Sequence, residues 1–205
     1  MKKMFFLSAL SLVIMISHAQ FSFGFRAGLN IANQSISNNN YSWGRQLNFN
    51  GGLGFNYQFS NPLQKMSLEA DVLYSQEGEK GTFVPTGESD VVKAKFVEIP
   101  VLVQYNLLSF LYVETGPQLS FLLSQKETLG TRVEDTKSNF RTNDLRWVFG
   151  AGYAFKTLPI KGTLGIDARY NFSLSAFNKK AVNGTSIKSN CFNIDLFYWL
   201  PTRKK

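Results

Sequence analysis

Histidine is almost absent from this chain of 205 residues, which contains a single one, His18. This residue lies in an N-terminal segment that we expect to be removed, so the mature chain would have no histidine as general base or metal ligand. No serine stands in a recognisable nucleophile turn, and no phosphate-binding loop or metal-ligand pattern is found in the sequence. We therefore expect a protein that is not an enzyme, with no catalytic residue, no metal and no cofactor.

Long apolar runs and cysteines are also scarce. Charged or strongly polar residues interrupt every apolar stretch after residue 20, whereas a membrane-spanning helix needs about 20 apolar residues. The single Cys191 cannot close an internal disulfide, and we expect it to be a small buried side chain. The only dense basic cluster is the C-terminal "RKK", so the net charge of +8 does not predict a nucleic-acid partner.

The first nineteen residues have the three parts of a secretory signal peptide. Lys2 and Lys3 precede an apolar run from Met4 to Ile16, and "SHA" supplies small residues at a cleavage site after Ala19. The apolar run is shorter than a spanning helix. We predict a cleaved signal peptide over residues 1–19, and hence an exported protein.

Period-two alternation of apolar and polar residues recurs along the rest of the chain, which is typical of β-strands. One face of each segment is apolar, with Leu53 and Val101 as examples, and every central charge falls on the other face. Eight segments show the pattern: residues 21–31, 47–59, 66–76, 96–106, 110–124, 145–155, 164–172 and 192–200.

Glycines on the polar face decide between a soluble barrel and a membrane barrel. Gly54, Gly116 and Gly150 share the face that carries the charges, and glycine there leaves room for large polar side chains in a narrow barrel interior. The apolar face holds more Phe, Tyr and Leu than such an interior could enclose, so it requires lipid. We predict an all-β fold, an eight-stranded antiparallel up-and-down transmembrane β-barrel over residues 20–200. A soluble lipocalin-like barrel is the alternative architecture.

The connections between these segments alternate between short and long. Outer-membrane barrels have short periplasmic turns and long external loops. Long loops are predicted at residues 32–46, 77–92, 126–144 and 177–188. The expected location is the cell outer membrane, with both termini in the periplasm and residues 201–205 as a short basic periplasmic tail.

Three strand sequences carry a resemblance to a known family. "FVEIPVLVQYN", followed after a tight turn by "FLYVETGPQLSFLLS", and "FGFRAGLNIA" near the start of the mature chain resemble the PorT-like outer-membrane β-barrel family of Bacteroidetes. The resemblance implies an eight-stranded barrel in the outer membrane and, for some relatives, a part in protein secretion. The chain departs from the usual pattern at "FYWLPTRKK", because outer-membrane barrels usually end at an aromatic residue.

The polar face of the strands, which points into the barrel, carries charged residues. We expect these residues to form a polar network in the lumen. A plug of ion pairs is the favoured interpretation, because eight strands leave space only for side chains or one small ligand; an ion or proton pathway is the alternative. Arg26 and Asp195 are predicted to pair across the seam between the first and last strands, and Pro100 is predicted to mark a bulge. The network comprises Arg26, Glu69, Asp71, Glu98, Glu114, Arg146, Asp167, Arg169 and Asp195.

The external loops are the predicted binding surface. Residues 77–92 are acidic, whereas Lys179, Lys180 and Lys188 make the last loop basic and are predicted to contact lipopolysaccharide phosphates. Residues 126–144, with Phe140, are the predicted contact for an envelope or secretion-machinery protein. The function predicted is binding, adhesion or an accessory role in secretion through these loops; a narrow pore or small-ligand carrier is the alternative.

Overall fold

One antiparallel sheet of nine strands dominates the computed structural model, which describes residues 20–34, 41–83, 88–155, 162–175, 178 and 188–200. The strands are β1 (Gln20–Gln34), β2 (Tyr41–Gln58), β3 (Met66–Phe83), β4 (Glu88–Asn106), β5 (Leu111–Leu129), β6 (Arg132–Asp135), β7 (Asn143–Phe155), β8 (Thr163–Ser173) and β9 (Ser189–Trp199). A single 3-10 turn, η1 (Lys137–Asn139), lies between β6 and β7. Within the described ranges, no helix is long and apolar enough to span a membrane. The predicted signal peptide and the tail at 201–205 fall outside these ranges.

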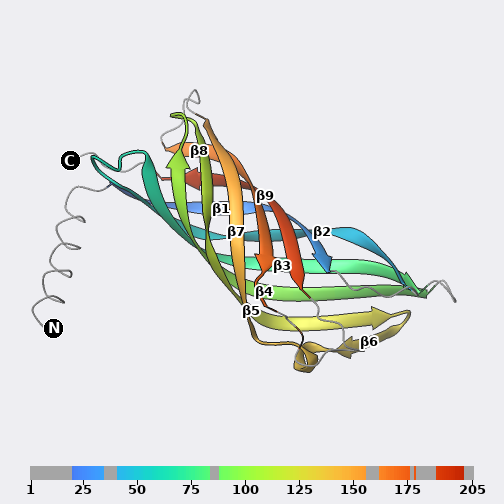
Figure 1. Ribbon diagram of the computed structural model, residues 1–205. Helices are drawn as coiled ribbons and strands as arrows, with labels where there is room; N and C mark the ends of the chain where they lie inside the picture. Colours follow the sequence, from blue (N-terminus) through green and yellow to red (C-terminus); the bar gives the residue numbers. More distant parts are fainter. Residues whose placement is uncertain are drawn as a thin grey trace, which may run out of the picture.

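Eight of the strands close into a barrel (Figure 1). The sheet runs in the order β4-β3-β2-β1-β9-β8-β7-β5, and β4 pairs with β5 to complete the ring. β6 pairs only with β5 and stands outside the ring. Gly24 of β1 faces Trp199 of β9, so the barrel begins and ends at the end that also carries the short turns at 59–65 and 107–110. The predicted eight-stranded antiparallel barrel is confirmed.

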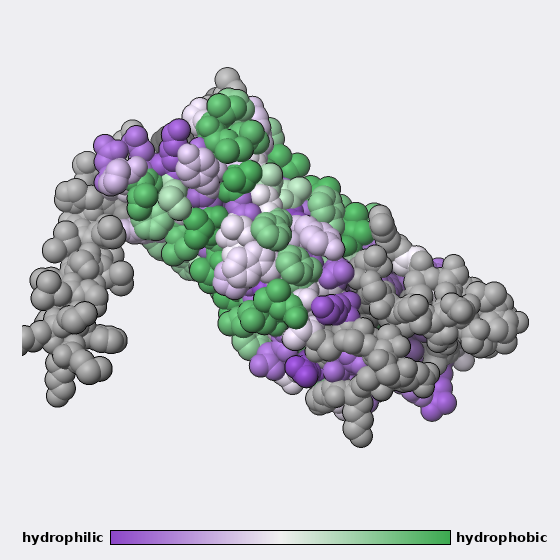
Figure 2. Space-filling model, in the orientation of Figure 1, coloured by the Kyte–Doolittle hydropathy of each residue, from purple (hydrophilic) through white to green (hydrophobic). Residues whose placement is uncertain are grey.

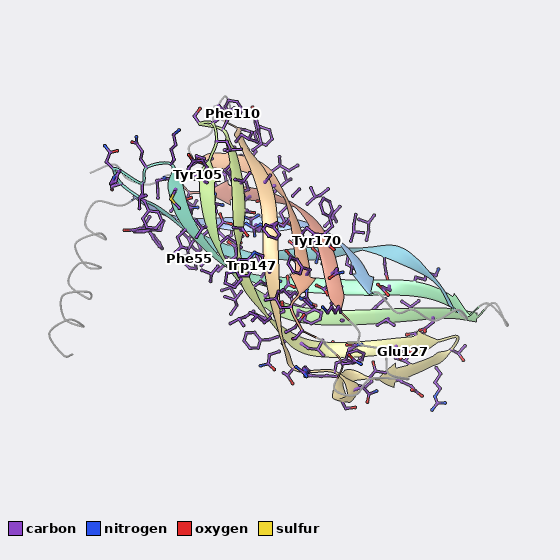
Figure 3. The ribbon with its side chains drawn as sticks, viewed as in Figure 1. Phe55, Tyr105, Phe110, Glu127, Trp147 and Tyr170 are labelled. Atoms are coloured by element: carbon purple, nitrogen blue, oxygen red, sulfur yellow. The ribbon has the colours of Figure 1, made fainter. Side chains whose placement is uncertain are left out.

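An apolar belt covers the outside of the barrel. Outward residues of different strands such as Phe25, Leu53, Val101 and Leu196 are between 39% and 55% exposed, and apolar surface covers the middle of the molecule in Figure 2. Figure 3 labels four aromatic residues of this belt, Phe55, Tyr105, Trp147 and Tyr170. A soluble protein rarely exposes a continuous apolar surface of this size, so the belt is the face that meets lipid.

Four strands run far beyond the belt at the end opposite the short turns. β2 to β5 contain 18 or 19 residues each, whereas β8 and β9 contain 11. Figure 1 shows the resulting extension, which we call the projecting sheet. We define it as residues 41–45 of β2, 77–83 of β3, 88–95 of β4, 124–129 of β5, and β6.

The projecting sheet corrects the predicted loops at 77–92 and 126–144, most of which are strand. Outside the belt the facing pattern changes: Lys93 and Lys95 point outward to water, while Ala94 and Phe96 are 1% exposed. Ala94, Phe96 and Leu122 form a small apolar cluster, and Phe140 packs against it. The side chain that was expected to offer a partner contact therefore covers this cluster.

Two bulges mark the boundary between the barrel and the projecting sheet. The β2–β3 ladder changes register between Arg45 and Asn50, and the β4–β5 ladder changes register between Lys95 and Phe96. The predicted bulge at Pro100 is wrong, because the pairing keeps the same offset on either side of this residue. The missing N–H is accommodated by a local gap in the β3–β4 ladder, where no partners are paired between Ala70 and Leu73.

Candidate functional site

The lumen holds all nine predicted network residues, and none of them is more than 3% exposed. Glycines provide the space for this packing. A Cβ atom at Gly150 would collide with the Glu114 carboxyl group, and one at Gly54 would collide with the Asp71 carboxyl group. Small residues on one strand therefore admit large charged side chains from its neighbours.

Arg26 of β1 is the centre of the first cluster, which we call the two-arginine cluster. Its Nη2 donates to Glu69 Oε1 at 2.6 Å, and its Nη1 donates to Asp167 Oδ2. Its Nε lies 3.3 Å from Asp71 Oδ2. The predicted seam contact is present as an ion pair, with Nη1 3.7 Å from Asp195 Oδ2, the longest of the four. The β1–β9 register is offset, so that Asp195 stands opposite Gly28.

Arg169 of β8 supplies the second guanidinium of the two-arginine cluster and crosses the lumen. Its Nη2 donates to Glu69 Oε1 at 2.5 Å and its Nη1 to Asp71 Oδ2 at 2.8 Å. Both acceptors belong to β3, which is four strands away from β8 in the ring in either direction. Its Nε also donates to Glu114 Oε1 of β5 at 2.6 Å. This side chain therefore bridges opposite walls of the barrel.

Neutral polar side chains extend the two-arginine cluster. Gln104 Nε2 donates to Glu69 Oε2 at 2.8 Å and to Glu114 Oε2 at 2.9 Å, and the Tyr112 hydroxyl donates to Asp167 Oδ2 at 3.1 Å. Toward the projecting sheet, asparagines form the next layer: Asn50 Nδ2 donates to Asp195 Oδ1 at 2.8 Å. Hydrogen-bonded side chains therefore extend across the lumen at this depth.

Arg146 of β7 forms a separate cluster nearer the projecting sheet, the Arg146 cluster. It donates through Nη1 and Nη2 to the two carboxylate oxygens of Glu77. Its Nε donates to Asp144 Oδ2 at 2.8 Å, and its Nη1 donates to Glu98 Oε1 at 3.1 Å. The guanidinium carbon also lies 4.9 Å from the centre of the Phe96 ring, within the range of a cation–π contact.

Sequence reasoning missed Glu77 and Asp144, because it assigned both to loops. Their inward parity was the available signal: Glu77 continues the Glu69 and Asp71 face of β3, and Asp144 continues the Arg146 face of β7. Cys191 is buried and free, as predicted.

Buried acids greatly outnumber buried bases in the described residues. The buried bases are Arg26, Arg146 and Arg169, and the buried acids are Glu69, Asp71, Glu77, Glu79, Asp90, Glu98, Glu114, Asp144, Asp167 and Asp195. One carboxylate oxygen each of Asp71, Asp144 and Asp167 makes no hydrogen bond. Each of these three carboxylates contacts an arginine through its other oxygen, but three arginines cannot balance ten acids. Buried charge without a counter-charge is costly, so part of this negative charge has to be neutralised by protons or cations. No group of His, Cys, Asp and Glu side chains in the described ranges is arranged to hold a metal ion.

Three acids of the projecting sheet have raised pKa values. Burial, together with the charge of Glu77, raises the pKa of Glu79 to about 8. Burial raises the pKa of Asp90, and burial together with the Asp90 charge raises the pKa of Glu127. These groups favour the protonated form because they are removed from water and stand near like charges.

Only one of the three lysines predicted to contact lipopolysaccharide belongs to the described residues. Lys188 is exposed beside the start of β9, whereas Lys179 and Lys180 lie outside the described residues. This contact stays a prediction.

Comparison with known proteins agrees with the fold. Residues 17–178 match the family described as outer membrane protein beta-barrel domain. No curated protein matches the chain. The crystal structure of OprG from Pseudomonas aeruginosa is 13% identical with a TM-score of 0.52, covering 90% of this chain and 96% of OprG. The neisserial surface protein NspA is 14% identical with a TM-score of 0.46, covering 88% of this chain and 97% of NspA. The family match over residues 17–178, with which the closed barrel and its apolar belt agree, shows that the chain belongs to the outer membrane protein beta-barrel domain family.

Proposed function

We propose that this protein is a non-enzymatic outer-membrane barrel with a closed lumen, and that it acts by binding through its projecting sheet on the outside of the cell. The observation that carries the proposal is the set of guanidinium groups that cross the lumen. Arg169 joins β8 to β3, and Arg146 joins β7 to β3 and β4. Side chains that link opposite walls leave no continuous water path between them.

The orientation of the barrel follows from its two ends. Short turns at 59–65 and 107–110 lie at one end, and the projecting sheet lies at the other. Outer-membrane barrels keep short turns in the periplasm and longer elements outside. We propose on this basis that both termini lie in the periplasm and the projecting sheet lies at the cell surface.

The finer assignment rests on the strand motifs of the β4–β5 hairpin. We propose that the chain is a PorT-like member of its family, as found in Bacteroidetes, and that its partner is an envelope or secretion-machinery protein. The outer strand β6 and the exposed end of the β5–β6 turn, where Gly130 to Val133 are exposed, offer a surface for such a partner. Pull-down of envelope proteins with the full chain and with a chain lacking residues 130–134 tests this assignment; equal capture by both would contradict it.

The closed lumen is tested by single-channel recording of the purified protein in planar bilayers. We expect no steady conductance at neutral pH, and we expect Arg146→Met to leave the barrel closed as well, because the two-arginine cluster remains in place. A steady conductance from the unaltered protein would overturn the proposal.

A narrow cation pore is the second candidate, and the excess of buried carboxylates favours it. Ten buried acids against three buried arginines, counted over the described residues, would attract cations and repel anions. The same recordings separate the two functions, because a pore of this kind would carry K⁺ in preference to Cl⁻ and would lose that preference in Glu98→Gln and Asp144→Asn variants.

A further inference from the structure

The barrel wall is interrupted between β2 and β3, just below the projecting sheet. The ladder stops at the pair Arg45–Glu79 and resumes at Asn50–Ser75, with one more residue in β2 than in β3 between them. A cleft of about 370 Å³ lies at this place, which is within the size range of small-molecule sites. The bulge and the cleft therefore lie at the same place on the barrel wall.

The cleft has an apolar side and a basic side. Leu29, Leu47 and Phe49 line it from β1 and β2, and these three side chains point to the outside of the barrel, where 49% to 65% of each is exposed. Lys93 and Lys95 line it from β4. A site that joins an apolar wall to two cations fits an amphiphile with a negatively charged head.

The lysines of this cleft have no acidic partner in the described part of the chain. Lys93 stands directly opposite Lys126 in the β4–β5 ladder, and like charges in such positions are unfavourable. Glu77 also lines the cleft, but both of its carboxylate oxygens accept hydrogen bonds from Arg146. An anion bound at Lys93 and Lys95 would reduce the repulsion between these positive charges and Lys126. It would not meet a free carboxylate, because Arg146 holds Glu77.

The height of the cleft matches the headgroup region of a membrane. Along β4 the outward residues are Val101, Ile99 and Val97, and then Lys95 and Lys93. The cleft spans this change from apolar to basic, where the acyl chains of a lipid would end and its headgroup would begin.

We propose that this cleft binds a phosphorylated lipid of the outer leaflet, with the phosphate at Lys93 and Lys95 and an acyl chain against Leu29, Leu47 and Phe49. The placement in the outer leaflet rests on the orientation given in the proposed function. Lipid binding by the purified protein depends neither on that orientation nor on a closed lumen, so the two proposals can fail separately.

The test measures binding of lipid A bisphosphate to the full, refolded protein in detergent by native mass spectrometry. Heat-modifiable migration first establishes that each variant is folded. We expect Lys93→Gln/Lys95→Gln to weaken binding about 10- to 100-fold, since each surface lysine contributes substantially to the attraction of anionic lipid. The matched control, Lys65→Gln/Arg132→Gln, removes two exposed basic side chains that do not line the cleft and should leave binding unchanged.

Two further probes examine the two halves of the site. Lipid A without phosphates should bind at least 10-fold more weakly, and Leu29→Ala/Phe49→Ala should weaken binding of the phosphorylated lipid by removing the acyl contact. Equal binding by the cleft variant and the unaltered protein would overturn the proposal. It would also be overturned by equal weakening in the control variant, or by inorganic phosphate displacing the lipid at the lipid's own concentration.

Discussion

The barrel belt and the projecting sheet are built from the same strands but face their surroundings in opposite ways. In the belt, β4 turns Val101 and Val103 outward and Glu98 inward. Six residues earlier the same strand turns Lys93 and Lys95 outward and Ala94 and Phe96 inward. The strand geometry is constant while the solvent changes, because the outer face meets lipid in one region and water in the other. A reversal of the apolar face within one strand thus marks the edge of the membrane.

The two regions also differ in how their buried acidic side chains are stabilised. In the lumen, three arginines form ion pairs with the buried carboxylates. In the projecting sheet, Glu79 and Asp90 are buried, and no described basic side chain forms an ion pair with either. Lumen acids that contact an arginine, Glu77 at the base of the projecting sheet among them, are therefore stabilised by cations, whereas burial favours the protonated forms of Glu79 and Asp90.

Removing a cation from the lumen should have the largest effect. Arg169→Met would leave Glu69, Asp71 and Glu114 without one of their partners, and breaking a buried ion pair costs about 3 to 5 kcal/mol. Urea unfolding in lipid vesicles would measure this loss. The matched Arg132→Met, at an exposed position on β6, should change stability by less than about 1 kcal/mol. Similar losses in both variants would contradict the plug.

Introducing lysine on the outer face should distinguish the two regions. Val101→Lys, and likewise Leu53→Lys, places a charge in the apolar belt and should cost about 2 to 4 kcal/mol. The inward Gln104→Lys should cost less, since Glu69 and Glu114 lie within hydrogen-bonding distance of that side chain. Refolding yield and urea midpoints in vesicles would measure both. Equal costs at positions 101 and 104 would refute the assignment of faces.

The projecting sheet should respond to pH through Glu79. Its pKa is about 8, raised from 4.5, so the folded sheet holds a proton that the unfolded sheet releases as the pH rises above 4.5. The contribution of Glu79 to stability is thus fully present below pH 4.5 and is lost as the pH rises to about 8. Hydrogen exchange of the β3–β4 hairpin should show at least about tenfold less protection at pH 8.5 than at pH 5. Glu79→Gln should abolish most of this difference, and an unchanged pH dependence in that variant would contradict the assignment.

The seam contact should give the smallest effect. Arg26 contacts Glu69, Asp71 and Asp167 more closely than it contacts Asp195. A double-mutant cycle with Arg26→Met and Asp195→Leu should therefore give a coupling energy of about 1 kcal/mol or less. The single Arg26→Met variant should lose much more, because Glu69, Asp71 and Asp167 each lose one of their two arginine partners. Full recovery of stability in the double mutant would show that Asp195 is the principal partner instead.

The sequence was sufficient for the barrel because lipid imposes one rule on every strand of the belt. Outward residues such as Phe149 and Leu196 had to be apolar, and inward residues had to be polar or small. This rule does not apply to the projecting sheet, which was therefore not predicted. Glu77, Glu79 and Lys80 show no apolar face, so this part of β3 was predicted to be a loop. Above the membrane a strand needs no outward apolar face, and alternation no longer identifies it.

The sequence predicted many of the residues that line the lumen, but not which of them form ion pairs with one another. Parity alone placed Arg146 and Arg169 inside, yet which acids they reach depends on the stagger of strands around the ring. Arg146 binds Glu77 and Asp144, both of which lie in segments that had been assigned to loops. The prediction of a bulge at Pro100 was wrong because a missing N–H can be accommodated by a gap in one ladder as well as by a bulge.

The account is tested most directly by the lipid accessibility of the outer face of β4. Spin labels at residues 93, 95, 97, 99 and 101, introduced one at a time, would report contact with membrane-dissolved oxygen and with a water-soluble nickel reagent. We predict that oxygen dominates at 97, 99 and 101 and that the nickel reagent dominates at 93 and 95. Oxygen dominating at all five positions, or the nickel reagent dominating at position 101, would contradict the boundary and with it the distinction between belt and projecting sheet.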